Sequence, residues 1–392
     1  MSIQRIGITW QITDLHGWGV FGLNLSLELA RHGPVPPLMI SPPYIASPTP
    51  RINRLLEPYL KEQPDVMQRI EQSADVVRLT DTVLLHSLGN AFMHSPISGQ
   101  VQGDINVGFI FFENGDLDDA ALERARRYDK IIAGSGWNRD LIRAHGFESC
   151  AFVSQGVDLE RFKPRTKTKA FGDRFVVFSG GKLELRKGQD TVLMAFKRFH
   201  DRHPDALLLS NWHNPWPDTI ADMARSPHFQ SAPGVNADGS LNLSKWIAEA
   251  GIPEDAHRDV GAVPNALLPP IFAEVDVALF ANRCEGGTNL VAMETMASGI
   301  PCILSANSGH KDIIADGNCY PLHKQTPSPA SVDPSGIWHE SDIDEIVEAL
   351  EQAYSDREAA RRRARAGVAF MQGLSWHNQI RQLVGELSEF MA

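Results

Sequence analysis

Residues 275–301 read VDVALFANRCEGGTNLVAMETMASGIP and give the clearest indication of the fold. The apolar run Val275–Phe280 has the length of a buried strand, and a polar loop with Gly286 and Gly287 joins it to a helical pattern over Leu290–Ser298. The free N–H groups and positive end of such a helix face the space beyond the strand, which suits an anion such as phosphate. The pattern fits equally an ordinary capped helix of an α/β fold.

The same alternation of strand-length apolar runs and helical patterns extends over most of the chain. The expected strands are Gln4–Trp10, Leu38–Ile40, Val83–His86, Ile105–Phe112, Lys130–Ala133, Ala151–Val153, Arg174–Phe178, Ala206–Ser210, Val275–Phe280 and Cys302–Leu304. The main expected helices are Leu117–Arg127, Asn138–His145, Gln189–His200, Leu290–Ser298, Asp342–Tyr354, Arg357–Met371 and Ser375–Met391. This order predicts an α/β protein with two doubly wound, Rossmann-like domains that face each other across a deep cleft.

The domain boundaries follow from composition. A polar stretch, Thr166–Gly172, reads as a linker, and the Pro/Ser-rich stretch Gln325–Ser335 reads as a loop. We therefore expect an N-terminal domain over residues 1–165, a C-terminal domain over residues 166–372 and a final helix within residues 373–392.

Composition excludes several classes of protein. The 392 residues carry 37 Lys and Arg against 48 Asp and Glu, a formal net charge of −11, which argues against a general nucleic-acid binder. The four cysteines are widely spaced, without a C-x-x-C pair, and suit a reducing cytosol. No apolar run reaches the roughly 18 residues of a spanning helix, so we expect a cytoplasmic protein. The basic cluster Arg124, Arg126, Arg127 and Lys130 reads as surface, and it leaves open a peripheral contact with an anionic membrane.

A second polar loop, Ser179–Gly188, follows the expected strand Arg174–Phe178. Lys182 and Lys187 lie five residues apart in it, so both ammonium groups can reach one diphosphate. Their charge would neutralise a departing nucleotide in a site of low dielectric. Taken alone, the loop also fits a solvated basic turn.

The two loops together resemble the donor site of retaining GT-B glycosyltransferases of the large fourth family, glycosyl transferases group 1. The family's G-R-L-x-x-x-K-G loop is matched in spacing by Gly181–Leu183 and Lys187-Gly188, and its L-V-x-x-E-A-x-A-x-G-x-P motif by Leu290–Pro301. Further similar segments are Ala133–Asn138, Gln155–Pro164, Gly261–Phe272 and Leu374–Trp376. The likeness covers most of the chain from about residue 100 onward.

The resemblance implies a hexosyltransferase that moves a sugar from a nucleotide diphosphate sugar to a saccharide or lipid-linked glycan, with retention of anomeric configuration. It makes the first domain the acceptor side and the second the donor side, and it implies that the final helix packs back on the first domain. Neither a metal nor another cofactor is expected, because the lysines and a helix terminus carry the neutralising charge. The expected donor-binding groups are Lys182, Lys187, the amides of Gly287, Thr288, Asn289 and Leu290, and Glu294 for the ribose.

The chain departs from the family pattern at two positions. Lys182 stands where the family has arginine, which keeps the charge and loses the two-pronged contact with phosphate. Glu285 and Glu294 are nine positions apart, one more than the family's E-x7-E. Glu294 therefore aligns directly with the second glutamate of the family motif. Glu285 aligns with the first glutamate, which contacts the donor sugar in the family, only if the alignment is shifted by one residue. These departures keep an alternative open, a nucleotide-sugar-binding subunit without transferase activity.

Two candidates lie in the first domain. Gly17–Gly19 reads as a turn at the place of the family's glycine-rich loop, with Gly19 near the donor phosphate. Glu113 ends the apolar run Val107–Phe112, and the family has a histidine or an acidic residue at about this place, near the reacting sugar carbon. A carboxylate there would assist proton removal or stabilise an oxocarbenium-like transition state. The alternative interpretations are an ordinary tight turn for Gly17–Gly19 and a strand-end cap for Glu113.

Two other sets of residues are assigned to the fold. Asp116-Leu117-Asp118 has the form of a D-x-D metal motif, but it precedes a helical pattern, so acidic N-capping is the favoured interpretation. His86 and His94, near a strand end, read as core or loop residues.

Overall fold

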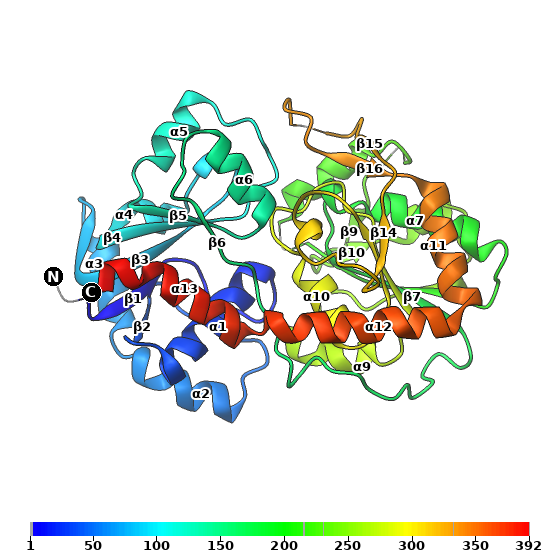
Figure 1. The fold of residues 1–392 in the computed structure, drawn as a ribbon, viewed down its shortest axis with the longest axis horizontal. Helices are drawn as coiled ribbons and strands as arrows, with labels where there is room; N and C mark the ends of the chain where they lie inside the picture. Colours follow the sequence, from blue (N-terminus) through cyan, green and yellow to red (C-terminus); the bar gives the residue numbers. More distant parts are fainter. Residues whose placement is uncertain (1–2, 215, 230, 332, 392) are drawn as a thin grey trace. The chain divides into compact units, whose positions relative to one another are not determined.

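The structure is a computed structural model that describes residues 3–214, 216–229, 231–331 and 333–391 (Figure 1). The chain divides into two compact units. Unit 1 consists of Met1–Gly156, Pro264–Ala266 and Leu374–Ala392, and unit 2 consists of Val157–Val263 and Leu267–Gly373. Each unit contains a six-stranded parallel sheet with helices around it, so the predicted α/β class with two doubly wound domains is confirmed.

The sheet of unit 1 has the order β2-β1-β3-β4-β5-β6. Its strands are β1 (Arg5–Ile8), β2 (Pro37–Met39), β3 (Val77–Leu88), β4 (Val101–Ile110), β5 (Lys130–Ala133) and β6 (Ala151–Phe152). The strands are almost wholly buried at their centres, as continuous apolar runs predict. The order reverses between β1 and β3, and right-handed crossovers on either side of this point place helices on both faces of the sheet.

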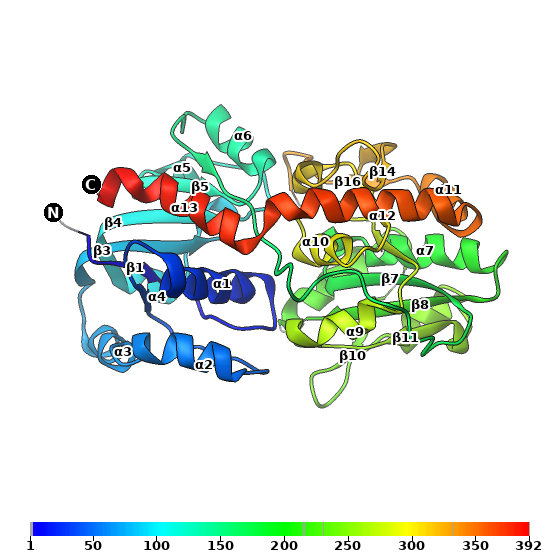
Figure 2. The same cartoon turned by 60° about the horizontal axis from the view of Figure 1, so that its bottom comes forward.

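The helices of unit 1 include one from the far end of the chain. They are α1 (Gly17–His32), α2 (Pro50–Leu56), α3 (Gln63–Gln72), α4 (Pro96–Gln100), α5 (Asp119–Ala125), α6 (Gly136–Ala144) and α13 (Trp376–Met391). Helix α13 packs against α1 (Figure 2). The rings of Trp376 and Phe21 are 5.8 Å apart at this contact. Lys130, from the basic cluster, is paired with Glu386 and Glu389 of α13 at 2.9 Å.

Unit 2 has the strand order β11-β8-β7-β12-β13-β14. Counted along the unit, this is the Rossmann order 3-2-1-4-5-6. The strands are β7 (Phe175–Lys182), β8 (Ala206–His213), β11 (His257–Asp259), β12 (Val277–Phe280), β13 (Cys302–Ser305) and β14 (Tyr320–Leu322). Helix α7 (Gln189–His200) packs with α11 (Ile343–Ser355), and α10 (Leu290–Ala297) packs with α12 (Arg357–Met371).

Smaller elements complete unit 2. They are the helices α8 (Ser244–Glu249) and α9 (Leu268–Phe272) and the strand pairs β9 (Gly234–Val235) with β10 (Leu241–Asn242) and β15 (Gln325–Pro327) with β16 (His339–Ser341). The loop prediction for Gln325–Ser335 is therefore wrong at its start, because β15 pairs with a strand that lies beyond the predicted loop. Thr166–Gly172 is irregular as expected. In the part of the chain that the structure describes, every helix is too short or too polar to cross a membrane.

The start of α1 corrects the glycine-turn prediction. Gly17–Gly19 is the first turn of the helix, capped by His16, whose Nδ1 accepts a hydrogen bond from the Gly19 N–H at 3.2 Å. A Cβ on Gly19 would lie 2.1 Å from Cγ2 of Thr13. Glycine at this position therefore allows α1 to approach the loop that follows β1, which accounts for it without a ligand. Contact of Gly19 with a donor phosphate stays a prediction.

Strand β4 also ends earlier than predicted, at Ile110 instead of Phe112. The side-chain amide of Asn138 takes the place of a neighbouring strand, because it donates to the Phe112 carbonyl at 3.1 Å and accepts from the Phe112 N–H at 3.2 Å. Glu113 therefore follows the strand by three residues and does not close it.

Candidate functional site

The two polar loops of unit 2 lie side by side at the point where the strand order reverses. Strands β7 and β12 are paired neighbours in the middle of the sheet, and the chain continues from them toward opposite edges. Residues 183–188 follow β7 and residues 281–289 follow β12. The Arg186 carbonyl accepts the N–H groups of Arg283 and Cys284 at 2.7 and 3.2 Å. Ligands of doubly wound sheets bind at such a switch point, so topology alone selects this place.

An ion pair between Lys187 and Glu285 joins the two loops. Nζ of Lys187 and Nδ2 of Asn282 both donate to Oε2 of Glu285, the latter at 2.7 Å, and the Arg186 guanidinium is 3.5 Å from the same oxygen. Burial raises the pKa of the Glu285 carboxyl, but the charges of Lys187 and Arg186 outweigh burial and lower the pKa to about 2. Glu285 is therefore an anion at neutral pH. Its contribution to stability is present above the ordinary pKa of 4.5 and is lost as the pH falls toward 2.

Lys182 lies at the end of β7, where its Nζ is paired with Glu184 and lies 4.4 Å from the centre of the Trp216 ring. Arg186 is paired with the other oxygen of Glu184 at 2.8 Å. Lys182, Arg186 and Lys187 thus face two carboxylates, Glu184 and Glu285, so the cations of this group outnumber its carboxylates by one. The loops keep a positive excess in a chain of charge −11, as an anion site requires.

Gly188 fixes the approach of the lysine loop to β12. It follows a 3-10 helix, η3 (Leu185–Lys187), and has a φ of 68°. A Cβ at this position would lie 2.0 Å from the Ala281 carbonyl oxygen. Both the left-handed backbone and the close approach require glycine, and together they bring Lys187 to the loop that carries Glu285.

The N-terminus of α10 is held by Asn289, which has a φ of 62°. Oδ1 of Asn289 accepts from the Ala292 N–H at 3.4 Å, and Nδ2 lies 3.0 Å from Nε2 of His310. Nδ1 of His310 is 3.2 Å from the Ser305 carbonyl, which only accepts, so Nδ1 carries the proton and Nε2 accepts from Asn289. Burial lowers the pKa of His310 to about 4, which keeps the ring neutral at pH 7.

The remaining predicted residues of this loop lie at the same helix start. Thr288 is buried, and its hydroxyl is 3.0 Å from the sulfur of Met293, so the side chain faces α10. Leu290 is the first residue of α10, and Glu294 lies about one turn further on with a buried side chain. The structure thus brings Lys182, Lys187, Glu285 and the start of α10 together at the carboxyl end of the central strands.

A third loop, which follows β13, supports Glu285. The Glu285 N–H donates to Oγ of Ser308 at 2.8 Å, and the Gly309 N–H donates to the Glu285 carbonyl at 2.9 Å. This loop was not among the predicted site segments. Its signal was the polar run after the strand Cys302–Leu304, which is the same signal that the two selected loops carry.

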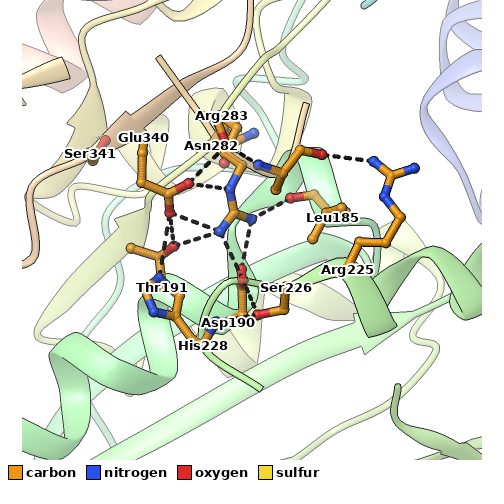
Figure 3. A network of polar contacts seen from close by, with 12 residues as sticks. Leu185, Asp190, Thr191, Arg225, Ser226, His228, Asn282, Arg283, Glu340 and Ser341 are labelled. Atoms are coloured by element: carbon orange, nitrogen blue, oxygen red, sulfur yellow. Dashed lines mark hydrogen bonds and ion pairs between the residues drawn. The ribbon is translucent and has the colours of Figure 1, made fainter. Parts of the chain in front are cut away.

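Arg283, also not predicted as a site residue, is the centre of a buried polar network (Figure 3). Its guanidinium makes two bonds of 2.8 Å to Asp190, bonds of 2.6 and 2.8 Å to Glu340 and one of 2.6 Å to the Leu185 carbonyl. Burial raises the pKa of Glu340, but its bond with His228 and the charge of Arg283 outweigh burial and lower the pKa to about 2. The network ties the start of α7, the 3-10 helix η3 and β16 to the loop of Glu285.

The structure places Glu113 and Gly19 in unit 1 and all other predicted site residues in unit 2. Glu113 is half-buried, and its N–H donates to Oδ1 of Asn90 at 2.8 Å. Contact of Glu113 with a substrate bound by the unit 2 residues stays a prediction. Asp118 caps α5 by accepting from the Ala121 N–H at 2.7 Å, which confirms the capping interpretation of the D-x-D sequence. His86 is buried, as a core residue would be.

A comparison with protein families shows to which family the chain belongs. The family model described as glycosyl transferases group 1 matches residues 160–369, more than half of the chain. The chain belongs to glycosyl transferases group 1. The match includes the lysine loop, the glutamate loop and the loop after β13.

Curated relatives of this group-1 protein are similar over part of their length. A GDP-mannose-dependent alpha-(1-6)-phosphatidylinositol monomannoside mannosyltransferase of Mycolicibacterium smegmatis is 27% identical over 175 residues, which are 41% of this chain and 40% of the relative. A D-inositol 3-phosphate glycosyltransferase of Corynebacterium aurimucosum is 25% identical over 303 residues, 70% of this chain and 62% of the relative. The chain thus spans 40% and 62% of the length of these two relatives.

Solved structures resemble the whole chain. Sucrose-phosphate synthase of Thermosynechococcus elongatus has a TM-score of 0.66 with 16% identity and 99% coverage of both chains. The Anabaena protein HepE in complex with UDP-glucose has a TM-score of 0.63 with 13% identity and covers 98% of this chain and 99% of its own. At such identities the likeness establishes the fold, and the predicted GT-B class is confirmed.

Proposed function

We propose that this protein is a retaining, metal-independent glycosyltransferase that moves a hexose from a nucleotide diphosphate sugar to a saccharide or lipid-linked acceptor. The observation that carries the proposal is the Lys187–Glu285 pair beside the start of α10, at the switch point of the unit 2 sheet. This place offers both a cation and helix amides for a diphosphate and an ionised carboxylate for the hydroxyls of a sugar.

In the proposed complex Lys182, Lys187 and the amides of Gly287–Leu290 hold the diphosphate, and Glu294 accepts hydrogen bonds from the ribose. Negative charge grows on the departing nucleotide, and a partly buried ammonium stabilises it more in the transition state than in the ground state. Glu285, which shares Lys187 with the diphosphate, orients the sugar. The departing phosphate itself takes the acceptor proton, and Glu113 of unit 1 assists there or stabilises the oxocarbenium-like carbon.

The names of the relatives suggest the substrates to try first. The relative from M. smegmatis is named for GDP-mannose and a phosphatidylinositol mannoside, and the one from C. aurimucosum for inositol phosphate. We propose GDP-mannose and UDP-glucose as the first donors and inositol-containing acceptors as the first acceptors. A lipid-linked acceptor would bring the protein to a membrane surface as a peripheral protein.

The test of this function uses the purified full chain with a panel of nucleotides and nucleotide sugars, in EDTA. We expect one nucleoside diphosphate to raise the melting temperature and the matching nucleotide sugar to be cleaved slowly without acceptor. A melting shift without release of sugar would instead support the alternative, a nucleotide-sugar-binding subunit. Activity that disappears with EDTA and returns with manganese would contradict metal independence.

Alanine at Glu285 and at Glu294 should give different defects. Glu285→Ala should impair transfer strongly and leave binding of the free nucleoside diphosphate nearly intact, because its proposed partner is the sugar. Glu294→Ala should weaken both, because its proposed partner is the ribose. Calorimetric titration with the nucleotide and initial rates of transfer measure the two effects. Equal loss of nucleotide affinity in both variants would contradict the assignment.

Glu113→Gln keeps the side-chain volume and removes the charge. If Glu113 acts on the acceptor or the sugar carbon, transfer should collapse while nucleotide affinity and melting temperature stay unchanged. The matched control is Glu123→Gln on the exposed face of α5, which should change none of the three. A fall in melting temperature with little effect on transfer would show that Glu113 only supports the chain after β4.

A further inference from the structure

We propose that Glu28, His32 and His377 form a binding site for a divalent transition-metal ion such as Zn²⁺. All three belong to unit 1, and none is among the predicted donor-site residues. The proposal rests on the contact between α1 and α13 and is independent of the proposed glycosyl transfer.

The ligand atoms of the three side chains already lie together. Glu28 and His32 are four residues apart on α1 and so share one face of the helix, and His377 is in the first turn of α13. One ligand atom from each lies within 4.8 Å of the others. Nδ1 of His377 is 3.1 Å from Oε2 of Glu28, and the rings of His32 and His377 are 5.4 Å apart. Tetrahedral zinc needs ligand atoms about 3.3 Å apart, so metal binding requires the side chains to draw closer together than the 4.8 Å within which they now lie.

The surroundings orient the carboxylate and leave the histidines accessible. Oε1 of Glu28 is paired with Arg31 at 3.2 Å, which leaves Oε2 toward the histidines and fixes the direction of the carboxylate. His32 is the last residue of α1, where the helix dipole stabilises positive charge. Glu28 is shielded, with a side chain only 13% exposed, whereas both histidines are exposed and open to an entering ion.

The donor set selects the kind of metal. Two imidazole nitrogens and one carboxylate suit Zn²⁺, Co²⁺ or Ni²⁺ better than Mg²⁺, which prefers oxygen ligands. Binding at Nδ1 of His377 would replace its contact with Glu28, and the neutral ring would then carry its proton on Nε2. The four cysteines are buried, and burial raises the pKa of Cys150, the one in unit 1, to about 12, so thiolates do not compete. A bound ion would fasten α13 to α1.

The test uses the full chain after chelator treatment and dialysis. Titration with Zn²⁺ against a chromophoric chelator should show one site per chain, and Zn²⁺ should raise the melting temperature where Mg²⁺ does not. His377→Ala and His32→Ala each remove a metal ligand and should weaken Zn²⁺ binding by more than about 10- to 100-fold. That range is the loss caused by removing a residue that only hydrogen-bonds to a metal ligand. His145→Ala, at an exposed histidine of unit 1 outside the cluster, should leave binding unchanged.

A second measurement keeps the result independent of stability. Co²⁺ should give the visible absorption bands of a tetrahedral N/O site, and Glu28→Gln should change them. Circular dichroism of each variant shows whether it is folded, and the exposed histidines make unfolding unexpected. Weak, unsaturable uptake of Zn²⁺ that all variants share would overturn the proposal and show an adventitious ion only. Neither outcome depends on donor cleavage.

Discussion

Replacing Lys187 by alanine is expected to lower kcat on the order of 100-fold or more, with a smaller effect on donor binding. Lys187 is a largely shielded cation of the switch-point site, with a side chain 11% exposed, and the charge of the departing nucleotide is larger in the transition state than in the bound donor. Initial rates over a range of donor concentrations, with nucleotide affinity measured separately, give the division between kcat and KM. Near-normal kcat with a raised KM would show that Lys187 holds only the ground state.

Two controls separate charge from structure in this variant. Lys197→Ala removes a lysine of unit 2 whose partner, Asp201, is an exposed neighbour four residues on, and it should leave kcat unchanged. Lys187→Ala also leaves Glu285 without its main partner, so its melting temperature is compared with that of Lys187→Ala/Glu285→Gln. If the double variant regains stability, the unpaired Glu285 carboxylate causes the destabilisation of Lys187→Ala. The kcat of Lys187→Ala is measured well below its melting temperature, so that its loss belongs to the missing ammonium.

Replacing Arg283 by methionine is expected to destabilise unit 2 by about 3–5 kcal/mol, because it leaves Asp190 and Glu340 without the cation they share. Hydrogen exchange of the amides of α7 and β12, followed with increasing urea, measures the opening free energy of this part of the fold. The matched control is Arg198→Met, whose exposed pair with Asp344 should contribute no more than about 1 kcal/mol.

A double-variant cycle tests the cause. Arg283→Met/Asp190→Asn should cost less than the sum of the single changes, because the second change removes one of the unpaired charges. Additive losses, or a loss below about 1 kcal/mol for Arg283→Met, would contradict a charge network that holds the loops. We also expect kcat of the Arg283 variant to fall more than nucleotide affinity, because the network fixes the backbone on which Lys187 and Glu285 are placed.

The sequence predicted the elements whose signal is local. The expected helices over Gln189–His200 and Arg357–Met371 have the bounds of α7 and α12. The first half of β3, the edge strands β11 and β14 of unit 2 and the pairs β9–β10 and β15–β16 were missed, because these segments are short or polar and become strands only through pairing with another strand. The start of α1 was misplaced, since Gly17–Gly19 reads as a turn until the contact of Gly19 with Thr13 is known.

The residues of the candidate site also fall into those that the sequence indicates and those that only the structure shows. The lysine loop and the glutamate loop were expected to share one donor site, but the contact of Lys187 with Glu285 was not predicted and follows from the adjacent ends of β7 and β12. Arg283 lies in the quoted stretch, yet an arginine in a polar loop reads as solvated, and only the tertiary fold shows that it is wholly buried. Ser308 and His310 support the site through single hydrogen bonds across loops, which no spacing in the sequence indicates.

The stereochemistry of donor cleavage tests the central claim most directly. The full chain is incubated in EDTA with GDP-mannose and, separately, with UDP-glucose, and the anomeric protons of the released sugar are followed by NMR from the first minutes. We predict release of nucleoside diphosphate together with a sugar that first appears in the anomeric configuration of the donor, and loss of this release in Lys187→Ala. Binding of the nucleoside diphosphate without any cleavage, or first appearance of the inverted anomer, would contradict the proposed retaining transferase.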